Sequence, residues 1–344
     1  MRIAIDAMGG DNAPSTIIDG VALAVKNNPV ITPVLVGPEQ KLRSLVKRHG
    51  HLSHAEFLHT EDVVAADDKP SAALRVGKNS SMRLSIDLVK AGEADAAVSA
   101  GNSGALMVMA LMVLRPMEGI DRPALAAFFP TLNGRCCMLD LGANIDCTSD
   151  HLVQFAIMGD AFSRVTSGVA SPSIGLLNVG EEEQKGSATI RQAATVLSNP
   201  EVNLNYSGFV EGDDITRGVV DIIVSDGFSG NIALKTAEGT ANLIMTKMRQ
   251  SFKSSLWSML GYLMARPALK TLRKSLNPQN YNGAVLLGLN GIVVKSHGAA
   301  DVVGIANAIG VAADMIGNSF IDDLKKSVER TVISVSSAAS EKDS

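Results

Sequence analysis

The chain is poor in several residue types that define particular protein classes. Aromatic residues make up 4% of its 344 residues, with a single Trp, and Gly, Ala, Val, Leu and Ile fill the apolar positions instead. Small aliphatic side chains of this kind are typical of buried parallel strands. The three cysteines, Cys136, Cys137 and Cys147, are too few and wrongly spaced for a disulfide framework or a metal site. We therefore expect a large aliphatic core, no metal and no disulfide.

Long apolar runs and a strong charge excess are also missing. No stretch reaches 18 apolar residues, so we expect no membrane-spanning segment. Strand-like residues follow Met1 directly, which leaves no room for a signal peptide. The formal net charge of −4 argues against a nucleic-acid partner. These features together predict a cytoplasmic protein.

The familiar catalytic motifs are absent as well. The dinucleotide fingerprint G-x-G-x-x-G does not occur, and although Gly175 and Gly180 have the spacing of a P-loop, Glu181 stands where that motif needs Lys. The chain has no H-E-x-x-H, C-x-x-C or G-x-S-x-G. Dehydrogenase, P-loop nucleotidase, metalloprotease, thiol redox and serine hydrolase functions are therefore not favoured.

What is present is a regular alternation of short apolar runs with stretches of helical periodicity. The helical stretches include 81–91 and 152–164. The strand-like runs are 3–6, 33–36, 94–99, 124–129, 137–141, 174–178 and 222–225. This alternation predicts an α/β fold with an open, mostly parallel sheet and helices on both faces. We expect a single α/β domain over 1–333 with a helical hairpin inserted at about 240–280, and a disordered tail at 334–344.

Five strand-like runs end on similar chemistry. They read "IAIDAMGGDN", "AVSAGNSGA", "MLDLGANID", "LLNVGEEEQKG" and "IIVSDGFSGN", with Gly beside Asn, Asp or Ser at each strand end. Ligands of open α/β sheets bind outside the carboxyl ends of the strands, so the loops predict one composite site at one edge. Tight turns are the alternative interpretation. The candidate substrate-binding residues are Asp6, Gly9, Gly10, Asp11, Gly101, Asn102, Ser103, Asn144, Asp226 and, after a further strand-like run, His297.

These loops offer amides, carboxylates and a lysine but no obvious covalent nucleophile. Such a set suits phosphate attacking a thioester, because phosphate brings its own nucleophilic oxygen and a thiolate leaves readily. The protein then supplies a cation and an oxyanion donor. Lys185 and Asn231 have suitable side chains, while a solvated Lys and a turn or N-cap Asn are the alternatives that the residues leave open.

The segment 239–300 contains no Asp or Glu, although the rest of the chain has 35. Its helical periodicity places Phe252, Leu256, Leu260 and Leu263 on one stripe beside Trp257, and Pro267 is expected to interrupt the helix before a basic segment with Lys270 and Arg273. An amphipathic basic hairpin can lie on a membrane surface or pack against a second copy in a dimer. Both roles are compatible with the sequence.

Eight segments in unbroken order carry a family resemblance. They are "MRIAIDAMGGDNAP", "AVSAGNSGALM", "GIDRPALA", "LDLGANID", "HLVQFAIMG", "GLLNVGEEEQKG", "VSDGFSGNIALKTAEG" and "NYNGAVLLGL". From Met1 to beyond His297 the chain resembles the bacterial PlsX-type phosphate acyltransferase family.

The resemblance implies a fold similar to phosphotransacetylase and isopropylmalate dehydrogenase. It implies transfer of a fatty acyl group from acyl-[acyl-carrier protein] to inorganic phosphate for phospholipid synthesis, with Lys185 and Asn231 as catalytic residues and no cofactor. It also implies a homodimer attached peripherally to the inner face of the cell membrane, with the downstream membrane glycerol-phosphate acyltransferase as a further partner. An acyl-CoA-dependent phosphotransacetylase and a non-catalytic scaffold of lipid synthesis are the alternatives.

Overall fold

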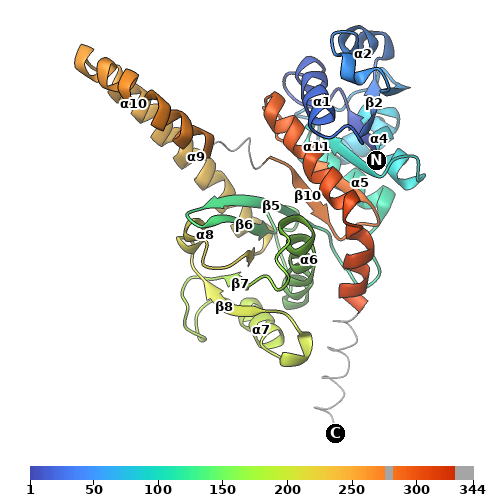
Figure 1. Ribbon diagram of the computed structural model, residues 1–344. Coiled ribbons are helices and arrows are strands. Elements are labelled where there is room, and N and C mark those ends of the chain that lie inside the picture. Colours follow the sequence, from blue (N-terminus) through green and yellow to red (C-terminus); the bar gives the residue numbers. More distant parts are fainter. Residues whose placement is uncertain (276–281, 330–344) are drawn as a thin grey trace.

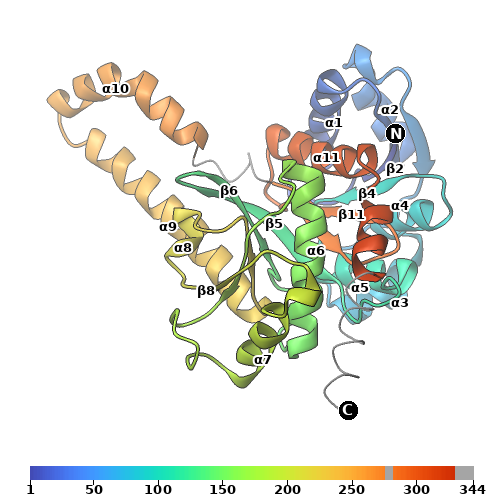
Figure 2. The same ribbon diagram turned by 60° about the horizontal axis from the view of Figure 1, so that its bottom comes forward.

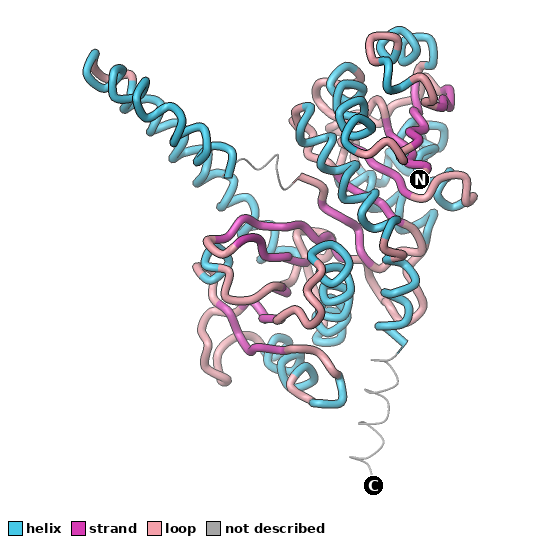
Figure 3. The backbone as a smooth tube through the Cα atoms, viewed as in Figure 1, coloured by secondary structure: helices cyan, strands magenta, loops and turns pink. Residues whose placement is uncertain are grey.

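The computed structural model describes residues 1–275 and 282–329, so the predicted tail 334–344 lies outside it (Figure 1). The strands of the described residues form one 11-stranded sheet in the order β3-β2-β1-β4-β11-β10-β5-β6-β9-β7-β8. Figure 3 shows the strands in magenta flanked by helices in cyan. The predicted class, an open and mostly parallel α/β sheet with helices on both faces, is confirmed.

The strands fall into two parallel groups of opposite direction. The first group is β1 (Arg2–Asp6), β2 (Thr32–Gly37), β3 (Glu56–His59), β4 (Ala96–Ser99) and β11 (Ile292–Lys295). The second group is β6 (Gly134–Leu139), β7 (Ile174–Leu177), β8 (Tyr206–Val210) and β9 (Ile222–Val224). Between them lie β10 (Ala284–Leu287) and β5 (Ala124–Thr131), joined to their neighbours by three antiparallel pairings. The direction therefore reverses across the middle of the sheet.

All seven predicted strands are present, with ends that differ by one to three residues. The predicted run 137–141 becomes β6, which starts earlier and stops at Leu139. Strand β11 corresponds to the further strand-like run before His297. Strands β3, β8 and β10 were not predicted. Each is short, and β3 and β8 carry partly exposed residues without a continuous apolar pattern.

Helices cover the two faces of the sheet through separate cores. Side chains alternate along each strand, so Ala96 and Val98 join the core beneath α1, α6 and α11, while Ala97 points to the opposite face and packs with α4 and α5. On that second face the apolar side chains of the other strand group pack against α9. Helices α4, α5 and α9 therefore lie on the same face of the sheet.

The remaining bounds complete the architecture. The helices are α1 (Ser15–Asn27), α2 (Glu39–Val46), α3 (Pro70–Val76), α4 (Ser81–Lys90), α5 (Ser103–Leu114), α6 (Ser149–Ser167), α7 (Ala188–Leu197), α8 (Asp214–Arg217), α9 (Gly227–Phe252), α10 (Leu256–Ser275) and α11 (Val302–Gly317). The last described helix is Phe320–Glu329.

Helices α9 and α10 project together from the sheet (Figures 1 and 2). The expected single stripe from Phe252 to Leu263 is wrong, because a turn at residues 253–255 separates the two helices. The ring of Phe252 instead contacts that of Tyr262 across the turn, with 5.3 Å between centroids. The expected interruption at Pro267 is also wrong, since α10 runs through it.

The exposed side of this pair is rich in large apolar side chains. Trp257 and Met264 are 83% and 84% exposed, and Leu243, Met259 and Leu263 are exposed as well. Leu256, Leu260, Lys270 and Arg273 lie on α10, where the structure describes only their backbone.

Within the described ranges, no individual helix combines the length and apolar character needed to cross a bilayer. One bent pair, α11 with the helix Phe320–Glu329, meets the criterion jointly at an angle of 61°. Most of the apolar side chains of α11 are buried in the core.

Candidate active site

Asp6 is the centre of the first polar cluster, at the end of β1. Its carboxylate is buried and accepts hydrogen bonds of 2.6 Å from the hydroxyls of Ser81 and Ser99. Burial raises the pKa of Asp6, and the hydrogen bonds from these two serines oppose the rise. Asp6 thus ties β1 to the start of α4 and to the end of β4, and it positions the loops around it.

The glycines beside Asp6 allow two loops to touch. A Cβ on Gly9 would lie 2.5 Å from Asp6 Oδ2 and 2.7 Å from the backbone nitrogen of Gly101. Gly10 has φ of +104°, a conformation that side chains disfavour. The loops after β1 and β4 therefore meet backbone to backbone, as the sequence predicted for neighbouring strand ends.

The other predicted residues of this group differ in their exposure and in the hydrogen bonds that they already make. Asn102 caps α5 by accepting from Ala105 N, and its Nδ2 donates to the carbonyls of Ala66 and Asp68, so its amide is already bonded. Ser103 is exposed at the first turn of α5. Asp11 donates its backbone N–H to Gly298 O, which brings the loop after β11 to the same place.

His297 lies in that loop after β11. Its backbone N–H donates to Asn282 Oδ1 at 3.0 Å, and its Nδ1 accepts from Ala299 N. His297 is exposed, and the neighbouring Gly298 accepts the backbone hydrogen bond from Asp11. The structure thus brings Asp6, Gly9, Gly10, Asp11, Gly101, Asn102, Ser103 and His297 together through three adjacent loops.

Asp140 is the centre of a second cluster, and the sequence did not single it out. It follows β6, is fully buried, and accepts from the backbone nitrogens of Leu125, Gly142, Ala143 and Asn144. Asn144 adds a side-chain bond of 2.9 Å to the same carboxylate. Burial raises the pKa of Asp140 against these hydrogen bonds. A carboxylate with this many partners shapes the loop rather than reacting.

The start of α9 packs directly on this second cluster. Asp226 caps the helix through a 2.7 Å bond from Ser229 N. A Cβ on Gly230 would lie 1.9 Å from the carbonyl oxygen of Asp140, so only Gly permits this contact. Asn231 follows, with its exposed amide beside Gly142. Asn144, Asp226 and Asn231 are therefore brought together, as predicted.

Lys185 lies in the loop after β7. Its Nζ is exposed and donates to the carboxylate of Glu182 at 2.9 Å, and this hydrogen bond raises the pKa of Lys185. Beneath the loop, Asn178 Nδ2 donates to the carbonyls of Gly180 and Lys185, while the buried Asn178 Oδ1 has no partner among the described residues. Among the described residues, the ion-pair partner of Lys185 is Glu182, while Asn231 lies beside Gly142 in the second cluster.

The prediction that all five loops share one edge of the sheet is wrong. The loops after β1 and β4 follow strands of one direction, and those after β6, β7 and β9 follow strands of the other. The two clusters are nevertheless related, because α4, α5 and α9 cover the same face. The candidate site therefore lies on the face of the sheet that α4, α5 and α9 cover, which we call the shared face. The Asp6 cluster belongs to the first strand group and the Asp140 cluster to the second.

Two lysines between the clusters were missed as site residues. Lys295 ends β11, and Lys235 lies on α9 four residues after Asn231. Burial and the positive charge of Lys235 together lower the pKa of Lys295 to about 8, against the opposing effects of Asp11 and Asp6. Neither lysine stands in a Gly-rich loop, so the loop pattern could not point to them.

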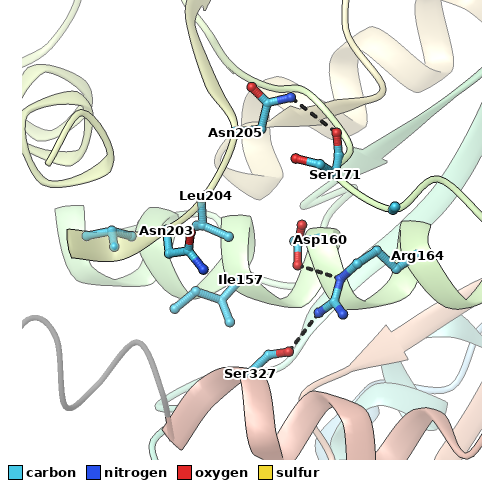
Figure 4. Close-up of a pocket in the computed structure, with 10 residues that line it drawn as sticks. Ile157, Asp160, Arg164, Ser171, Asn203, Leu204, Asn205 and Ser327 are labelled. Carbon is cyan, nitrogen blue, oxygen red and sulfur yellow. Dashed lines mark hydrogen bonds and ion pairs between the residues drawn. The ribbon is translucent and has the colours of Figure 1, made fainter. Parts of the chain in front are cut away.

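One cavity lies away from these clusters. A space of about 400 Å³ opens between α6, residues 203–205 and the last described helix. Figure 4 shows Arg164 on its wall, bonded to Asp160 and to Ser327. None of the predicted site residues lines it. In residues 1–275 and 282–329, no group of three or more His, Cys, Asp or Glu side chains is arranged to hold a metal ion.

Comparisons with known proteins place the chain in a family. A family model described as "Fatty acid synthesis protein" matches residues 1–323. The chain is similar to the phosphate acyltransferase of Rhodospirillum centenum, with 53% identity over 98% of this chain and 95% of the relative. It is 50% identical to the phosphate acyltransferase of Parvibaculum lavamentivorans, over 96% of this chain and 92% of that one.

Solved structures share the fold at low identity. A phosphotransacetylase from Streptococcus pyogenes superposes with a TM-score of 0.61 at 18% identity, covering 92% of this chain and 94% of that one. A branched-chain phosphotransacylase from Enterococcus faecalis gives 0.56 at 13% identity, covering 92% and 99%. The expected similarity to phosphotransacetylase is confirmed at the level of fold. Together with the relatives above, this establishes that the chain belongs to the phosphate acyltransferase family and is an acyltransferase.

Proposed function

We propose that the enzyme transfers a fatty acyl group reversibly from the thioester of acyl-[acyl-carrier protein] to inorganic phosphate. The product, acyl phosphate, would serve the first acylation step of phosphatidic acid synthesis. The observation that carries the proposal is the shared face, where Asn231 and Lys235 lie on α9 and where the charges of Lys235, Asp11 and Asp6 act on Lys295. The lysines offer positive charge to the phosphate anion, and the Asn231 amide offers a donor to the oxyanion of the thioester carbonyl. Such a site suits a reaction in which phosphate itself is the nucleophile.

The reaction is a direct displacement. A phosphate oxygen attacks the thioester carbonyl carbon, a C–O bond forms, and the carbonyl electrons move onto oxygen. The exposed Asn231 amide donates to this oxyanion. The electrons then return, the C–S bond breaks, and the thiolate leaves with its electron pair. Lys185 pairs with the phosphate after releasing Glu182. Of the loops at Gly9, Gly10, Gly101 and Asn102, the backbone at Gly10 and Asn102 supplies N–H groups, since those of Gly9 and Gly101 already donate to Asp6 O and Ser99 Oγ.

The state of the cysteines supports a mechanism without an acyl-enzyme. Burial raises the pKa of Cys136 to about 12 and moves that of Cys137 well above its usual value. Burial and the nearby Asp140 raise the pKa of Cys147 to about 11. Because the thiolate is the reactive form, these thiols are poor nucleophiles at neutral pH.

The acyl donor is the test of this proposal. An acyl-CoA-dependent phosphotransacetylase is the second candidate, favoured by the shared fold. Purified enzyme is mixed with phosphate and either acyl-[acyl-carrier protein] or acyl-CoA, and free thiol is measured. The proposal expects release from the carrier protein, whereas release from acyl-CoA alone supports the second candidate. No phosphate-dependent release from either donor would leave a non-catalytic scaffold.

We also propose a homodimer that attaches peripherally to the inner face of the cell membrane and passes acyl phosphate to a membrane acyltransferase. The exposed apolar side chains of α9 and α10 support this, together with exposed basic residues such as Lys247, Lys253 and Arg266. No Asp or Glu occurs from residue 239 to residue 275. An anionic lipid surface is the partner that such a helix pair fits.

A further inference from the structure

Three neighbouring parallel strands end in a polar row. Ile5 pairs with Val98 in the ladder, so Asp6 and Ser99, each the next residue, lie side by side, and Ser99 pairs directly with Lys295. Residues in register on parallel strands point to the same face. Lys295 therefore extends the Asp6–Ser99 hydrogen-bonded pair toward the middle of the sheet.

Helix α9 reaches this row from the other strand group. Ala284 of β10 pairs with Lys295, and Ala284 packs in the same apolar cluster as Ala233 and Leu234 of α9. This shared cluster places the first turns of α9 on the face of the sheet to which Lys295 points. Asn231 and Lys235 are four residues apart, so they lie on the same side of α9.

The charges at this point are unusually arranged. After burial, the largest influence on the pKa of Lys295 is the positive charge of Lys235, which lowers it, while Asp11 and Asp6 act in the opposite direction. Two ammonium groups held near each other repel, and a bound anion removes that cost. Lys295 donates to the carbonyl of Ser296, and Lys235 pairs with Glu238 at 2.8 Å. Both partners are ones that an anion can replace.

We propose that Lys235 and Lys295 together form the subsite that holds the attacking phosphate, one helical turn from Asn231. The inference rests on the proposed acyl transfer to phosphate and gives the nucleophile a place. Lys185, on an exposed loop after β7, then approaches a phosphate that is already bound. Phosphate is held between the two strand groups, where both loop clusters border the same face.

The test is phosphate binding by Lys235→Met and Lys295→Met, with Lys90→Met at the exposed end of α4 as the matched control. Inorganic phosphate is titrated while the thermal unfolding midpoint is followed. Each lost charge-assisted contact should raise the phosphate needed for the half-maximal shift roughly ten- to hundredfold. Lys295→Arg should recover part of the loss, and Lys90→Met should match the wild type. Because the Lys235 side chain is exposed, Lys235→Met is expected to fold whatever the effect at Lys295.

Steady-state kinetics separates this inference from the proposed function. If the pair holds phosphate, the KM for phosphate rises by the same factor in both variants and the KM for the acyl donor stays constant. Unchanged phosphate dependence in both variants, with normal phosphate-dependent thiol release by the wild type, overturns the subsite but leaves the function. A rise in the donor KM alone also overturns it, since the pair then binds an anionic group of the donor. If the wild type releases no thiol yet shows the lysine-dependent phosphate shift, the function fails and the subsite stands.

Discussion

Lys185 and Asn231 differ in how firmly the structure holds them. Asn231 sits on a long helix whose start is fixed against Asp140 by Gly230, so its amide has a defined position. Lys185 sits on an exposed loop and is paired with Glu182, an ion pair of the kind that contributes little to stability. The Asn231 amide is thus preorganised, whereas in the proposed mechanism Lys185 must release the carboxylate of Glu182 before it can pair with phosphate.

Removing either side chain should lower turnover with the fold intact. One oxyanion donor is worth about 3 kcal/mol, so Asn231→Ala should lower kcat roughly a hundredfold, and Lys185→Ala should cost at least as much. The measurement is phosphate-dependent thiol release, with circular dichroism to check folding and the exposed Lys26→Ala as the control. Near-normal turnover of a folded Lys185→Ala enzyme would contradict its catalytic role.

Lys295 should give stability an unusual pH dependence. Its folded pKa is about 8 and its ordinary value is 10.5, so below pH 8 the folded protein carries the full cost of the buried charge. Above pH 8 the folded form loses the proton while the unfolded form keeps it up to pH 10.5, and the wild type gains stability relative to a neutral variant. Lys295→Met should therefore unfold at higher temperature than the wild type at pH 7, with the gap narrowing toward pH 10. A gap independent of pH would show that burial and the charge of Lys235 do not lower the pKa of Lys295.

Several site residues could be predicted from the sequence and several could not. Asp6, Gly9, Gly101 and Asn231 stand next to glycines at strand ends, which is a local pattern. Asp140 is distinguished only by its burial in the folded protein, and Lys235 only by the effect of its charge on Lys295. Burial and contact across strands arise from tertiary packing, which a local pattern does not contain.

Helix α9 carries Asn231 near its start and belongs to the projecting pair α9–α10. Two of its glycines differ in the space that surrounds them. Gly230 touches the backbone of Asp140, whereas Gly239 has nothing within 4 Å of the position of a Cβ. The first glycine is fixed by packing and the second is not.

Gly230→Ala and Gly239→Ala therefore form a matched pair. The added methyl at residue 230 must displace backbone, which should lower the free energy of unfolding by roughly 1–3 kcal/mol. The same change at residue 239 should raise it by about 0.5–1 kcal/mol, because Ala favours the helix. Urea unfolding followed by circular dichroism measures both. Equal effects at the two positions would mean that the α9–Asp140 contact is absent.

The pair α9–α10 also explains two errors of sequence-based prediction. Serines near the turn bond locally, as Ser254 does to the carbonyl of Ser251, and such bonds compete with helix continuation. Pro267 removes one backbone donor, but on a projecting helix the freed carbonyl can be solvated, so α10 continues. Periodicity detected the apolar character of the segment without locating the turn.

Membrane attachment can be tested on the described side chains of this pair. Trp257→Ser with Met264→Ser removes two apolar groups that each contribute about 1.5–3 kcal/mol when buried, so vesicle binding should weaken by at least about tenfold. Flotation with vesicles containing anionic lipid is the measurement. The control is Val30→Ser with Leu132→Ser, which changes two apolar side chains of 63% and 85% exposure elsewhere. Unchanged flotation of the α10 variant would exclude this surface as the anchor, and light scattering of both variants would show whether the proposed dimer forms and whether it is lost.

At the scale of the whole molecule, the unexpected feature is the reversal of strand direction. The alternation of strands and helices predicted the class and all seven long apolar strands. It did not predict that β10, from late in the chain, inserts beside β5 and separates two parallel groups. Strand order depends on contacts between distant segments, which a local sequence pattern does not contain. The alternation alone therefore predicted one edge for all five loops. The structure replaces that edge with a face bordered by α4, α5 and α9.

The central claim is that phosphate itself attacks the thioester on this face. A single-turnover experiment with excess enzyme and acyl-[acyl-carrier protein] tests it, with thiol release and the intact mass of the enzyme followed with and without phosphate. The account predicts no thiol burst and no mass increase without phosphate, and stoichiometric acyl phosphate once phosphate is added. A burst of thiol without phosphate, accompanied by an acylated enzyme, would contradict it.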